Sequence, residues 1–421
     1  MKKFDNGFLL GAATAAHQVE GNNVYSDFWV MEQLPHSDFD EPSLLAVDHY
    51  NRYEEDIRLL ANAGLNAYRF SIEWARIEPV KGRYDAGEIE HYRKVLNCCR
   101  DNGVTPIVTM HHFSSPKWLV AEGGWENEAT IEYFKCYCAF VVKNLGDMME
   151  YVCTINEANM GLQIASVARD IMRQMGIELQ VGMNFPLSEE RKCQKEEAAI
   201  AFGIKDVSQV NTFLSLRSPA GDLLIMRAHE AAREAMKALC PHLQVGLTLS
   251  LYDIQPQPGG EKMAEKEWEE HFSHYLPFIQ KDDFLGVQNY SRKRMDAKGA
   301  LPSAKGAKMT EMDYEFYPEG IGNVIRTVSK DLPIPLIVTE NGIATMDDDR
   351  RAEFITRALA GVLACVDDGI PVKGYMYWSL LDNFEWQKGF SKHFGLIAVD
   401  RETQEREPKE SLYVLGEYLN K

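Results

Sequence analysis

The chain has no long apolar run and no excess of basic residues. No stretch of about 18 apolar side chains occurs in its 421 residues, so we expect no membrane-spanning helix. Its 63 acidic and 45 basic residues give a formal net charge of −18. A surface of that sign repels the phosphates of nucleic acids and of anionic membranes, so neither is an expected partner. No long apolar core follows the basic start at Lys2 and Lys3, and we therefore expect no secretory signal.

Cysteine motifs are absent as well. The chain has eight cysteines, but none forms a Cys-x-x-Cys pair, and no His-x-x-x-His or similar metal-ligand spacing lies near them. Most stand in apolar contexts, where a reduced cysteine behaves as a small hydrophobic residue. Because thiols stay reduced in the cytoplasm, this usage predicts a cytoplasmic protein without a metal site.

Short apolar runs alternate with longer amphipathic stretches, and no linker-like segment interrupts them. This alternation is typical of a parallel α/β sheet. Eight strand–helix units of this length predict a (β/α)8 TIM barrel that forms a single catalytic domain over residues 1–421. A doubly wound sheet is the competing architecture, but no Gly-x-Gly-x-x-Gly follows an early strand. The expected strands are Phe8–Ala13, Ala67–Ser71, Pro106–Met110, Tyr151–Ile155, Val245–Ser250, Phe284–Asn289, Leu336–Thr339 and Gly374–Ser379, and the expected helices include Tyr53–Ala63, Glu88–Asn102, Ile131–Leu145, Asp222–Leu239 and Arg350–Asp367.

Polar and aromatic side chains gather where the expected strands end. In a (β/α)8 barrel the reactive groups lie at the carboxyl ends of the strands, which meet at one mouth. The chain follows this rule at seven of its eight strands, so we expect these side chains to share a site. They are Gln18, Arg69, His111, His112, Asn156, Glu157, Tyr290, Glu340 and Trp378.

Two glutamates carry the most chemical information. Glu157 stands in TINEAN directly after one strand, and Glu340 stands in IVTENG at the end of another. Cleavage of a glycosidic bond needs two carboxyl groups, one to protonate the leaving oxygen and one to attack or stabilise the sugar centre. Either glutamate alone is more often a solvated strand end. Their neighbours favour a site, since Asn156 offers an amide for a sugar hydroxyl and Gly342 is expected to form a tight turn.

Arg69 interrupts an otherwise apolar strand, and a buried arginine needs a carboxylate partner. Glu340 is the expected partner because a guanidinium would keep it ionised, and Glu73 is the structural alternative. His112 is a candidate hydrogen-bond donor to a sugar hydroxyl, whereas His111 has the character of a core histidine.

The sequence WSLLDNFEW joins Trp378 and Trp386 with an acid, Glu385, between them. Aromatic faces stack on the C–H face of a pyranose, and a carboxylate can bind two adjacent hydroxyls. Tryptophans are common in barrel cores, but this combination favours a sugar site.

Residues from about 160 to 220 do not follow the regular alternation of strands and helices. The segment is too long for a simple connection after the fourth strand, and it contains Met172, Met175 and Met183. We predict an extended loop with one or two helices over the barrel mouth, lining the leaving-group side of the pocket. Packing against the flank of the barrel is an equally open alternative.

Taken together, these motifs resemble those of glycoside hydrolase family 1, the β-glucosidases, over nearly the whole chain and in the family's order. The resemblance implies that Glu340 is the nucleophile and Glu157 the acid/base, with Asn156 at the sugar 2-hydroxyl and Tyr290 touching the nucleophile. It also implies that the sugar is held by Gln18, His112, Trp378, Glu385 and Trp386, with Arg69, Gln288 and Phe394 in support. The matching motifs are GAATAAHQVEG (11–21), HFSSP (112–116), TINE (154–157), NYS (289–291), VTENG (338–342), WSLLDNFEW (378–386) and FGLIAVD (394–400).

The chain departs from the family pattern at several positions. Ala158 follows the acid/base glutamate where proline is usual, His17 replaces an aromatic residue, and Gln288 stands where asparagine is frequent. The stretch after Asn159 also differs from the usual connection. Apart from His17, these departures lie towards the leaving-group side, so they put the aglycone preference in doubt and not the chemistry.

The resemblance implies a retaining double displacement without a cofactor or metal, in which the two carboxyl groups lie about 5–5.5 Å apart. The expected substrate is a small β-glycoside or oligosaccharide that loses a terminal non-reducing β-D-glucosyl, galactosyl or fucosyl residue. The charge of Glu340 should raise the pKa of Glu157, while Arg69 should lower that of Glu340.

Three other functions stay open on the same fold. A 6-phospho-β-glycosidase would need a phosphate-binding serine, lysine and tyrosine near the C-terminal motif. Here Lys392 is present, but Phe394 stands in place of the tyrosine and Glu385 would repel a phosphate. A transglycosylase would use the same residues with an alcohol as acceptor, and a non-catalytic sugar-binding barrel would have lost one glutamate. The sequence leaves the oligomeric state open, including a homo-oligomer.

Overall fold

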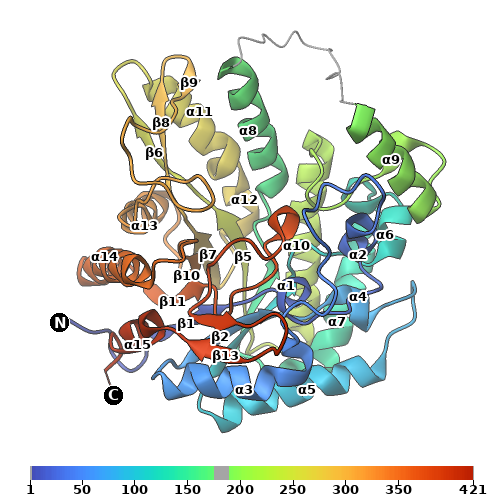
Figure 1. Cartoon of the computed structure of the whole chain (residues 1–421), viewed down its shortest axis with the longest axis horizontal. Helices are drawn as coiled ribbons and strands as arrows, with labels where there is room; N and C mark the ends of the chain where they lie inside the picture. Colours follow the sequence, from blue (N-terminus) through green and yellow to red (C-terminus); the bar gives the residue numbers. More distant parts are fainter. Residues whose placement is uncertain (1, 175–188, 421) are drawn as a thin grey trace.

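The computed structural model describes residues 2–174 and 189–420 and contains a closed barrel of eight parallel strands (Figure 1). The strands are β1 (Leu9–Ala13), β2 (Ala67–Ser71), β3 (Thr105–His111), β4 (Tyr151–Ile155), β5 (Gln244–Ser250), β7 (Phe284–Gln288), β10 (Leu336–Asn341) and β11 (Val372–Trp378). β1 pairs with both β2 and β11, which closes the sheet on itself. The predicted (β/α)8 barrel is therefore confirmed, with strand ends displaced by one or two residues from those expected.

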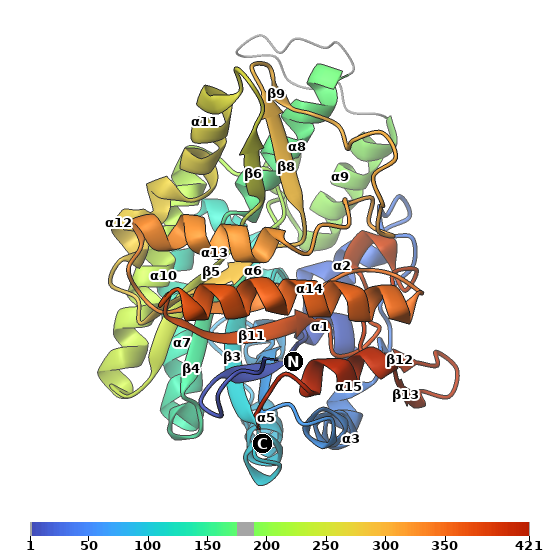
Figure 2. The ribbon, with the colours of Figure 1, turned by 90° about the vertical axis from the view of Figure 1, so that its left-hand side faces the viewer.

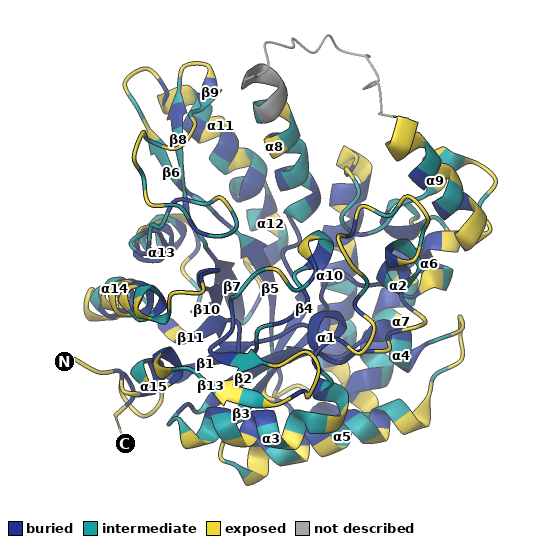
Figure 3. Ribbon diagram, in the orientation of Figure 1, coloured by how far each residue is buried: buried dark blue, intermediate teal, exposed yellow. Residues whose placement is uncertain are grey.

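The barrel strands are apolar on both faces because one face fills the barrel and the other carries the helices. Leu9, Ala67, Ile107 and Cys153 belong to the cluster inside the barrel. Their sequence neighbours, such as Leu10 and Val152, belong to the larger cluster that packs under the surrounding helices. Figure 3 shows the consequence, with buried strands at the centre and exposed residues on the outer sides of the helices.

The helices around the barrel begin earlier than the apolar periodicity predicts. They are α3 (His49–Asn62), α5 (Ala86–Asp101), α7 (Thr130–Leu145), α10 (Pro219–Leu239), α13 (Gly320–Asp331) and α14 (Asp348–Asp367). Several begin at a polar cap: Asp85 accepts hydrogen bonds from the first-turn amides of α5, and Ser218 and Asp347 do the same for α10 and α14. The residues directly after these caps are small, charged or proline, so they add no large apolar residue to the periodic pattern. Figure 2 shows α13 and α14 side by side on the outside of the barrel.

The predicted insertion after β4 forms helices at two different places. α8 (Met160–Gln174) leaves the carboxyl end of β4 and lines the mouth of the barrel, as expected. α9 (Glu189–Phe202) packs instead against α2 (Asp27–Glu32) and α6 (Lys117–Ala121), which lie in the connections after β1 and β3, so it is at neither of the two predicted positions. Met175 and Met183 lie outside the described residues, as does the side chain of Met172.

Smaller elements complete the mouth and the base. A three-stranded sheet of β6 (Asp253–Pro256), β8 (Arg292–Asp296) and β9 (Gly299–Ala300) lies with α11 (Glu261–His271) at the same end of the barrel as α8 (Figure 1). The other short elements are α1 (Ala16–Val19), α4 (Trp74–Ile77), α12 (Leu276–Ile279), β12 (Ile397–Val399), β13 (Arg406–Pro408) and α15 (Glu410–Gly416). The two ends of the described chain meet, since the Phe4 amide donates to the Tyr418 carbonyl at 2.8 Å. Within residues 2–174 and 189–420, no helix combines the length and apolar character needed to cross a membrane.

Candidate active site

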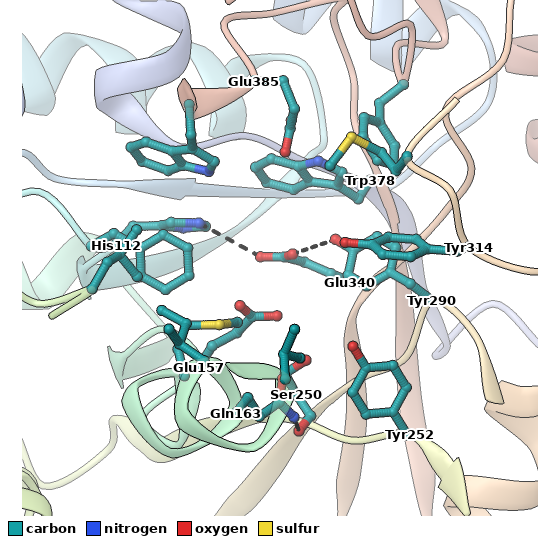
Figure 4. Close-up of a pocket in the computed structure, with 18 of the residues that line it drawn as sticks. His112, Glu157, Gln163, Ser250, Tyr252, Tyr290, Tyr314, Glu340, Trp378 and Glu385 are labelled. Atoms are coloured by element: carbon teal, nitrogen blue, oxygen red, sulfur yellow. Dashed lines mark hydrogen bonds and ion pairs between the residues drawn. The ribbon is translucent and has the colours of Figure 1, made fainter. Parts of the chain in front are cut away.

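A cavity of about 440 Å³ opens at the carboxyl ends of the barrel strands. Both Glu157 and Glu340 line it, and Figure 4 shows their carboxyl groups facing one another across it. The two residues are 183 positions apart in sequence, yet the barrel brings them together because β4 and β10 end at the same mouth. This is the arrangement that the two motifs predict.

Glu157 is held in an unusual backbone conformation. Its φ is 41°, in the left-handed region that glutamate rarely adopts. The strained turn after β4 is fixed by the Glu157 amide, which donates to Thr248 Oγ1 at 2.8 Å, and by the Ala158 amide, which donates to the Thr248 carbonyl at 3.0 Å. Backbone strain of this kind persists where the surrounding structure forces a side chain into position.

Glu340 is held by two hydrogen bonds. Arg69 Nη1 donates to Oε1 at 2.6 Å, and the Tyr290 hydroxyl donates to Oε2 at 2.6 Å. The predicted pair with Arg69 is therefore present, and the alternative partner Glu73 instead accepts from the Ala75 amide at the start of α4. Glu340 lies within β10, since the strand continues to Asn341 beyond its predicted end.

The expected tight turn at Gly342 is not what the structure shows. A side chain on Gly342 would bring a Cβ to 1.9 Å from the Trp378 carbonyl oxygen, so glycine is needed there for close packing of β10 against β11.

The two carboxyl groups titrate in different surroundings. Burial and the nearby charge of Glu340 raise the pKa of Glu157 well above the ordinary glutamate value. Burial also raises the pKa of Glu340, but Arg69 and the Tyr290 hydroxyl oppose that rise by stabilising the carboxylate. Arg69 thus lowers the pKa of Glu340 as expected without outweighing burial. Of the two carboxyl groups, Glu340 is therefore the easier to ionise.

Asn156 connects Arg69 to the cavity wall. Its Oδ1 accepts from Arg69 Nη2 at 2.6 Å and from Gln288 Nε2 at 2.8 Å, which fixes Nδ2 as the donor. Nδ2 lies 3.1 Å from Nε2 of His112, a cavity residue whose pKa burial lowers well below the ordinary value. Arg69, Asn156 and Gln288 are therefore a buried layer behind the cavity that orients its lining.

The far end of the cavity carries the predicted sugar platform. Trp378, Glu385, Trp386 and Phe394 all line it. Burial and the charge of Glu340 raise the pKa of Glu385 to about 8. Gln18 lies behind this wall: its Nε2 donates to the Phe384 carbonyl at 2.7 Å, and its buried Oε1 has no partner among the described residues.

His111 and His17 both pack against aromatic rings and have structural roles. His111 lies 2.9 Å from Ser115 Oγ and packs its ring against Trp125 and Phe213, which makes it the core histidine that was expected. His17, at the position where the family has an aromatic residue, lies parallel to Trp386 with ring centroids 5.9 Å apart and pairs with Glu32 at 2.7 Å. It thus supports the platform from behind.

Comparison with known proteins identifies the family. The model of glycosyl hydrolase family 1 matches residues 1–199 and 269–421. The chain belongs to glycosyl hydrolase family 1. β-Glucosidase A of Thermotoga maritima is 29% identical, with 98% of this chain and 97% of that protein covered. 6-Phospho-β-galactosidase 1 of Streptococcus pneumoniae strain R6 is 30% identical over 99% of this chain and 98% of that protein. Among solved structures, the β-glycosidase BGL167 is 44% identical and superimposes with a TM-score of 0.90, covering 99% of this chain and 96% of that chain.

Several residues of this family 1 site were not predicted from the sequence. β5 carries Thr248 and Ser250, and Tyr252 follows it closely. The rule that functional side chains lie at strand ends applies to β5 as well, but no motif marks these residues. Others come from connections outside the barrel, where no periodic pattern indicates which side chains face a cavity. These are Met160, Ile164, Val167 and Tyr314. Among the described residues, no cluster of His, Cys, Asp and Glu side chains could hold a metal ion.

Proposed function

We propose that this family 1 hydrolase is a retaining β-glycosidase that removes terminal non-reducing β-D-glucosyl residues, with galactosyl and fucosyl residues as further candidates. The observation that carries the proposal is the unequal pair of carboxyl groups in one cavity. Glu340 accepts two hydrogen bonds that stabilise its charge, whereas burial and that charge keep Glu157 protonated. The β-glucosidase and β-glycosidase relatives support the substrate class.

In the first step, a carboxylate oxygen of Glu340 attacks the anomeric carbon while Glu157 gives its proton to the glycosidic oxygen. The C–O bond to the leaving group breaks, and the aglycone departs as an alcohol. In the second step, Glu157 removes a proton from water, the water oxygen attacks the anomeric carbon, and the bond to Glu340 breaks.

The change of role at Glu157 follows from the electrostatics. While Glu340 is ionised, its charge raises the pKa of Glu157 and keeps the acid protonated. Once Glu340 is esterified to the sugar it carries no charge, so the pKa of Glu157 falls and the group becomes a base. One carboxyl can therefore serve both steps without another proton donor.

The remaining predicted residues would bind the sugar. Asn156 Nδ2 is fixed as a donor beside His112, and we propose that it meets the sugar 2-hydroxyl. Glu385 offers a carboxyl group at the far end, with the unpartnered Oε1 of Gln18 buried behind this wall, and Trp378 and Trp386 offer flat faces for the ring. His112 completes the wall between these two groups.

A phosphorylated glycone fits this cavity less well. Glu385 faces the cavity and offers a phosphate no positive charge, and Phe394 offers no hydroxyl to bind one. Lys392 Nζ donates to the Glu311 carbonyl at 2.8 Å, so the expected phosphate-binding cation already has a partner. Plain glycosides are therefore favoured over 6-phosphoglycosides, and product analysis separates hydrolysis from transglycosylation.

The domain organisation and location are proposals of the same kind. One catalytic domain over residues 1–421 is supported by the closed barrel and by the pairing of Phe4 with Tyr418. A reducing, cytoplasmic location is supported by the eight cysteines, all of which have free thiols.

The decisive experiment assigns the two glutamates with nitrophenyl β-glucoside. We expect Glu340→Ala to lose roughly 10⁴- to 10⁶-fold in kcat, as when a covalent nucleophile is removed. Azide occupying the vacated space should restore turnover and give a glycosyl azide of inverted configuration. In Glu157→Ala, azide should attack from the leaving-group face and give the retained configuration.

The exposed loop variant Glu402→Ala is the matched control and should hydrolyse like the parent protein. Full activity in Glu340→Ala, or the same azide product from both variants, would remove the proposed roles. Parallel assays with 6-phosphoglucosides test the alternative substrate, and faster turnover of those would overturn the glycone assignment.

A further inference from the structure

Ala158, the residue directly after Glu157, is held on both sides. Its amide donates to the Thr248 carbonyl at 3.0 Å, and its carbonyl accepts from Arg217 Nη1 at 2.7 Å. Ala158 stands where proline is usual, and a proline would fix its own φ and offer no N–H. Alanine has no such internal restraint, so the turn that carries Glu157 depends on these outside contacts for its shape.

Arg217 is a buried cation without a carboxylate partner among the described residues. It is 9% exposed, and its two hydrogen bonds go to the backbone carbonyls of Ala158 and Phe213, each at 2.7 Å. Its guanidinium also lies over the Phe213 ring, 4.6 Å from the centroid. Burial lowers the pKa of Arg217 to about 10, so the side chain is still charged at neutral pH.

The acids whose charges act on Arg217 have other partners. Asp222 accepts a hydrogen bond from the Tyr275 hydroxyl at 2.7 Å, and Glu126 accepts one from the Ser218 amide at 2.9 Å. A buried charge is unfavourable unless hydrogen bonds compensate it. For Arg217 that compensation comes from the two carbonyls, one of which belongs to the turn of the proposed acid.

The side chain of Arg217 is itself firmly placed. Phe213 is fully buried, and its ring packs against the rings of His111 and Trp125. On the other side, Gly161 in the first turn of α8 lies so close that a Cβ there would be 2.9 Å from Arg217 Cζ. The guanidinium therefore connects an aromatic cluster of the core with the start of α8, directly after the Glu157 turn.

This contact joins two parts of the chain with different relations to the family. Glu157 and Ala158 lie in the first stretch that the family model matches, whereas Phe213 and Arg217 lie between the matched stretches 1–199 and 269–421. The support for the acid/base turn thus comes from a segment outside the family match.

We propose that Arg217 is a positioning residue, which holds the Ala158 carbonyl and so keeps the Glu157 carboxyl group aimed at the leaving oxygen. The inference rests on the proposed function. Glu157 has a φ of 41°, and strain of this kind persists only where the surroundings over-determine the backbone. Without the guanidinium, the peptide after Ala158 can rotate, and Glu157 can relax to an ordinary conformation that withdraws its proton from the substrate.

The test compares two aryl glucosides whose leaving groups differ in their need for a proton: phenyl β-glucoside and 2,4-dinitrophenyl β-glucoside. Dinitrophenolate leaves without protonation, whereas the departure of phenol needs the acid. We expect Arg217→Met to lower kcat/KM for phenyl β-glucoside by roughly 10- to 100-fold, the effect of a displaced catalytic group. For the dinitrophenyl glucoside kcat/KM should change by about twofold or less, because this constant covers only the steps up to the departure of the leaving group.

A second readout comes from the later step, in which Glu157 is the base. With the dinitrophenyl glucoside, kcat and KM of Arg217→Met should fall together, because the glycosyl-enzyme accumulates when its reaction with water is slowed. Arg93→Met is the matched control, since Arg93 Nη2 also donates to a backbone carbonyl, that of Asn144 at 2.8 Å, away from the cavity. It should leave both substrates unaffected.

Arg217→Lys keeps a cation that can reach one carbonyl, so its loss with phenyl β-glucoside should be smaller than that of Arg217→Met. If Arg217→Met does not fold, the ratio of the two substrates in Arg217→Lys decides in the same way. Equal losses for both glucosides, or no loss for either, would overturn the positioning role and leave the proposed function intact. Failure of the parent protein to cleave any β-glucoside would remove both.

Discussion

The two ends of the cavity are built differently. At the sugar end, the side chains come from the barrel strands and the segments that follow them directly, and a buried layer of Arg69, Asn156 and Gln288 fixes their orientation. At the leaving-group end, the walls come from α8 and from the connections that carry Tyr252 and Tyr314. There the side chains are mostly apolar and make few hydrogen bonds.

This difference separates what the barrel fixes from what its connections can change. Closing the barrel determines the sugar end, because all strand ends meet at one mouth. The connections are free to vary without disturbing that closure.

The largest effect is expected at the buried layer beneath the sugar end. Arg69→Met should leave Glu340 and Asn156 Oδ1 without their partner, which costs about 3–5 kcal/mol in the free energy of unfolding. It should also raise the pKa of Glu340 and move the acid limb of the kcat/KM profile to higher pH. Urea unfolding and a pH profile measure the two effects.

Arg233→Met is the control for this variant, since Arg233 pairs with buried Asp282 away from the cavity. It should lose stability and keep the pH profile of the parent protein. A similar profile in Arg69→Met would show that Arg69 is structural only.

A smaller and more selective effect is expected at Glu385. Glu385→Gln keeps the shape but replaces a carboxyl group that can bind two sugar hydroxyls, so kcat/KM should fall by roughly 10- to 100-fold. Because the sugar is the same in every glucoside, the factor should be equal for benzyl, nitrophenyl and glucosyl leaving groups. A factor that varied with the leaving group would show that Glu385 does not act on the sugar end alone.

The smallest effect is a shift in the pH profile at Tyr290. Its hydroxyl donates to the Glu340 carboxylate and so favours the ionised form. Tyr290→Phe should raise the pKa of Glu340 and move the acid limb of kcat/KM up by about one pH unit, the size of a charged hydrogen bond. Glu340 must be ionised to attack, so activity should be lost first on the acid side.

The control for this shift is Tyr314→Phe, which changes a tyrosine that lines the same cavity. Its acid limb should stay where it is in the parent protein. Equal shifts in both variants would mean that the hydroxyl bond to Glu340 does not set this pKa.

The order of the strands and the positions of Glu157 and Glu340 were readable from the sequence. Both follow from local information, since an apolar strand is a short run and its end is marked by the next polar residue. The pairing of Arg69 with Glu340 was one of two alternatives until β2 and β10 were placed in the same barrel. Ser250 ends a predicted strand and Tyr252 follows it, but no neighbouring motif distinguished them from a solvated strand end.

The sequence by itself determined the barrel and the two carboxyl groups, because alternating apolar runs and strand-end motifs are properties of neighbouring residues. Only the tertiary structure decided that α8 lines the cavity while α9 packs against α2 and α6, and which face of α8 points inward. Those outcomes depend on contacts such as Ser166 with Glu267, between residues about a hundred positions apart. Periodicity describes one helix at a time, so it carries no information about which partner that helix meets.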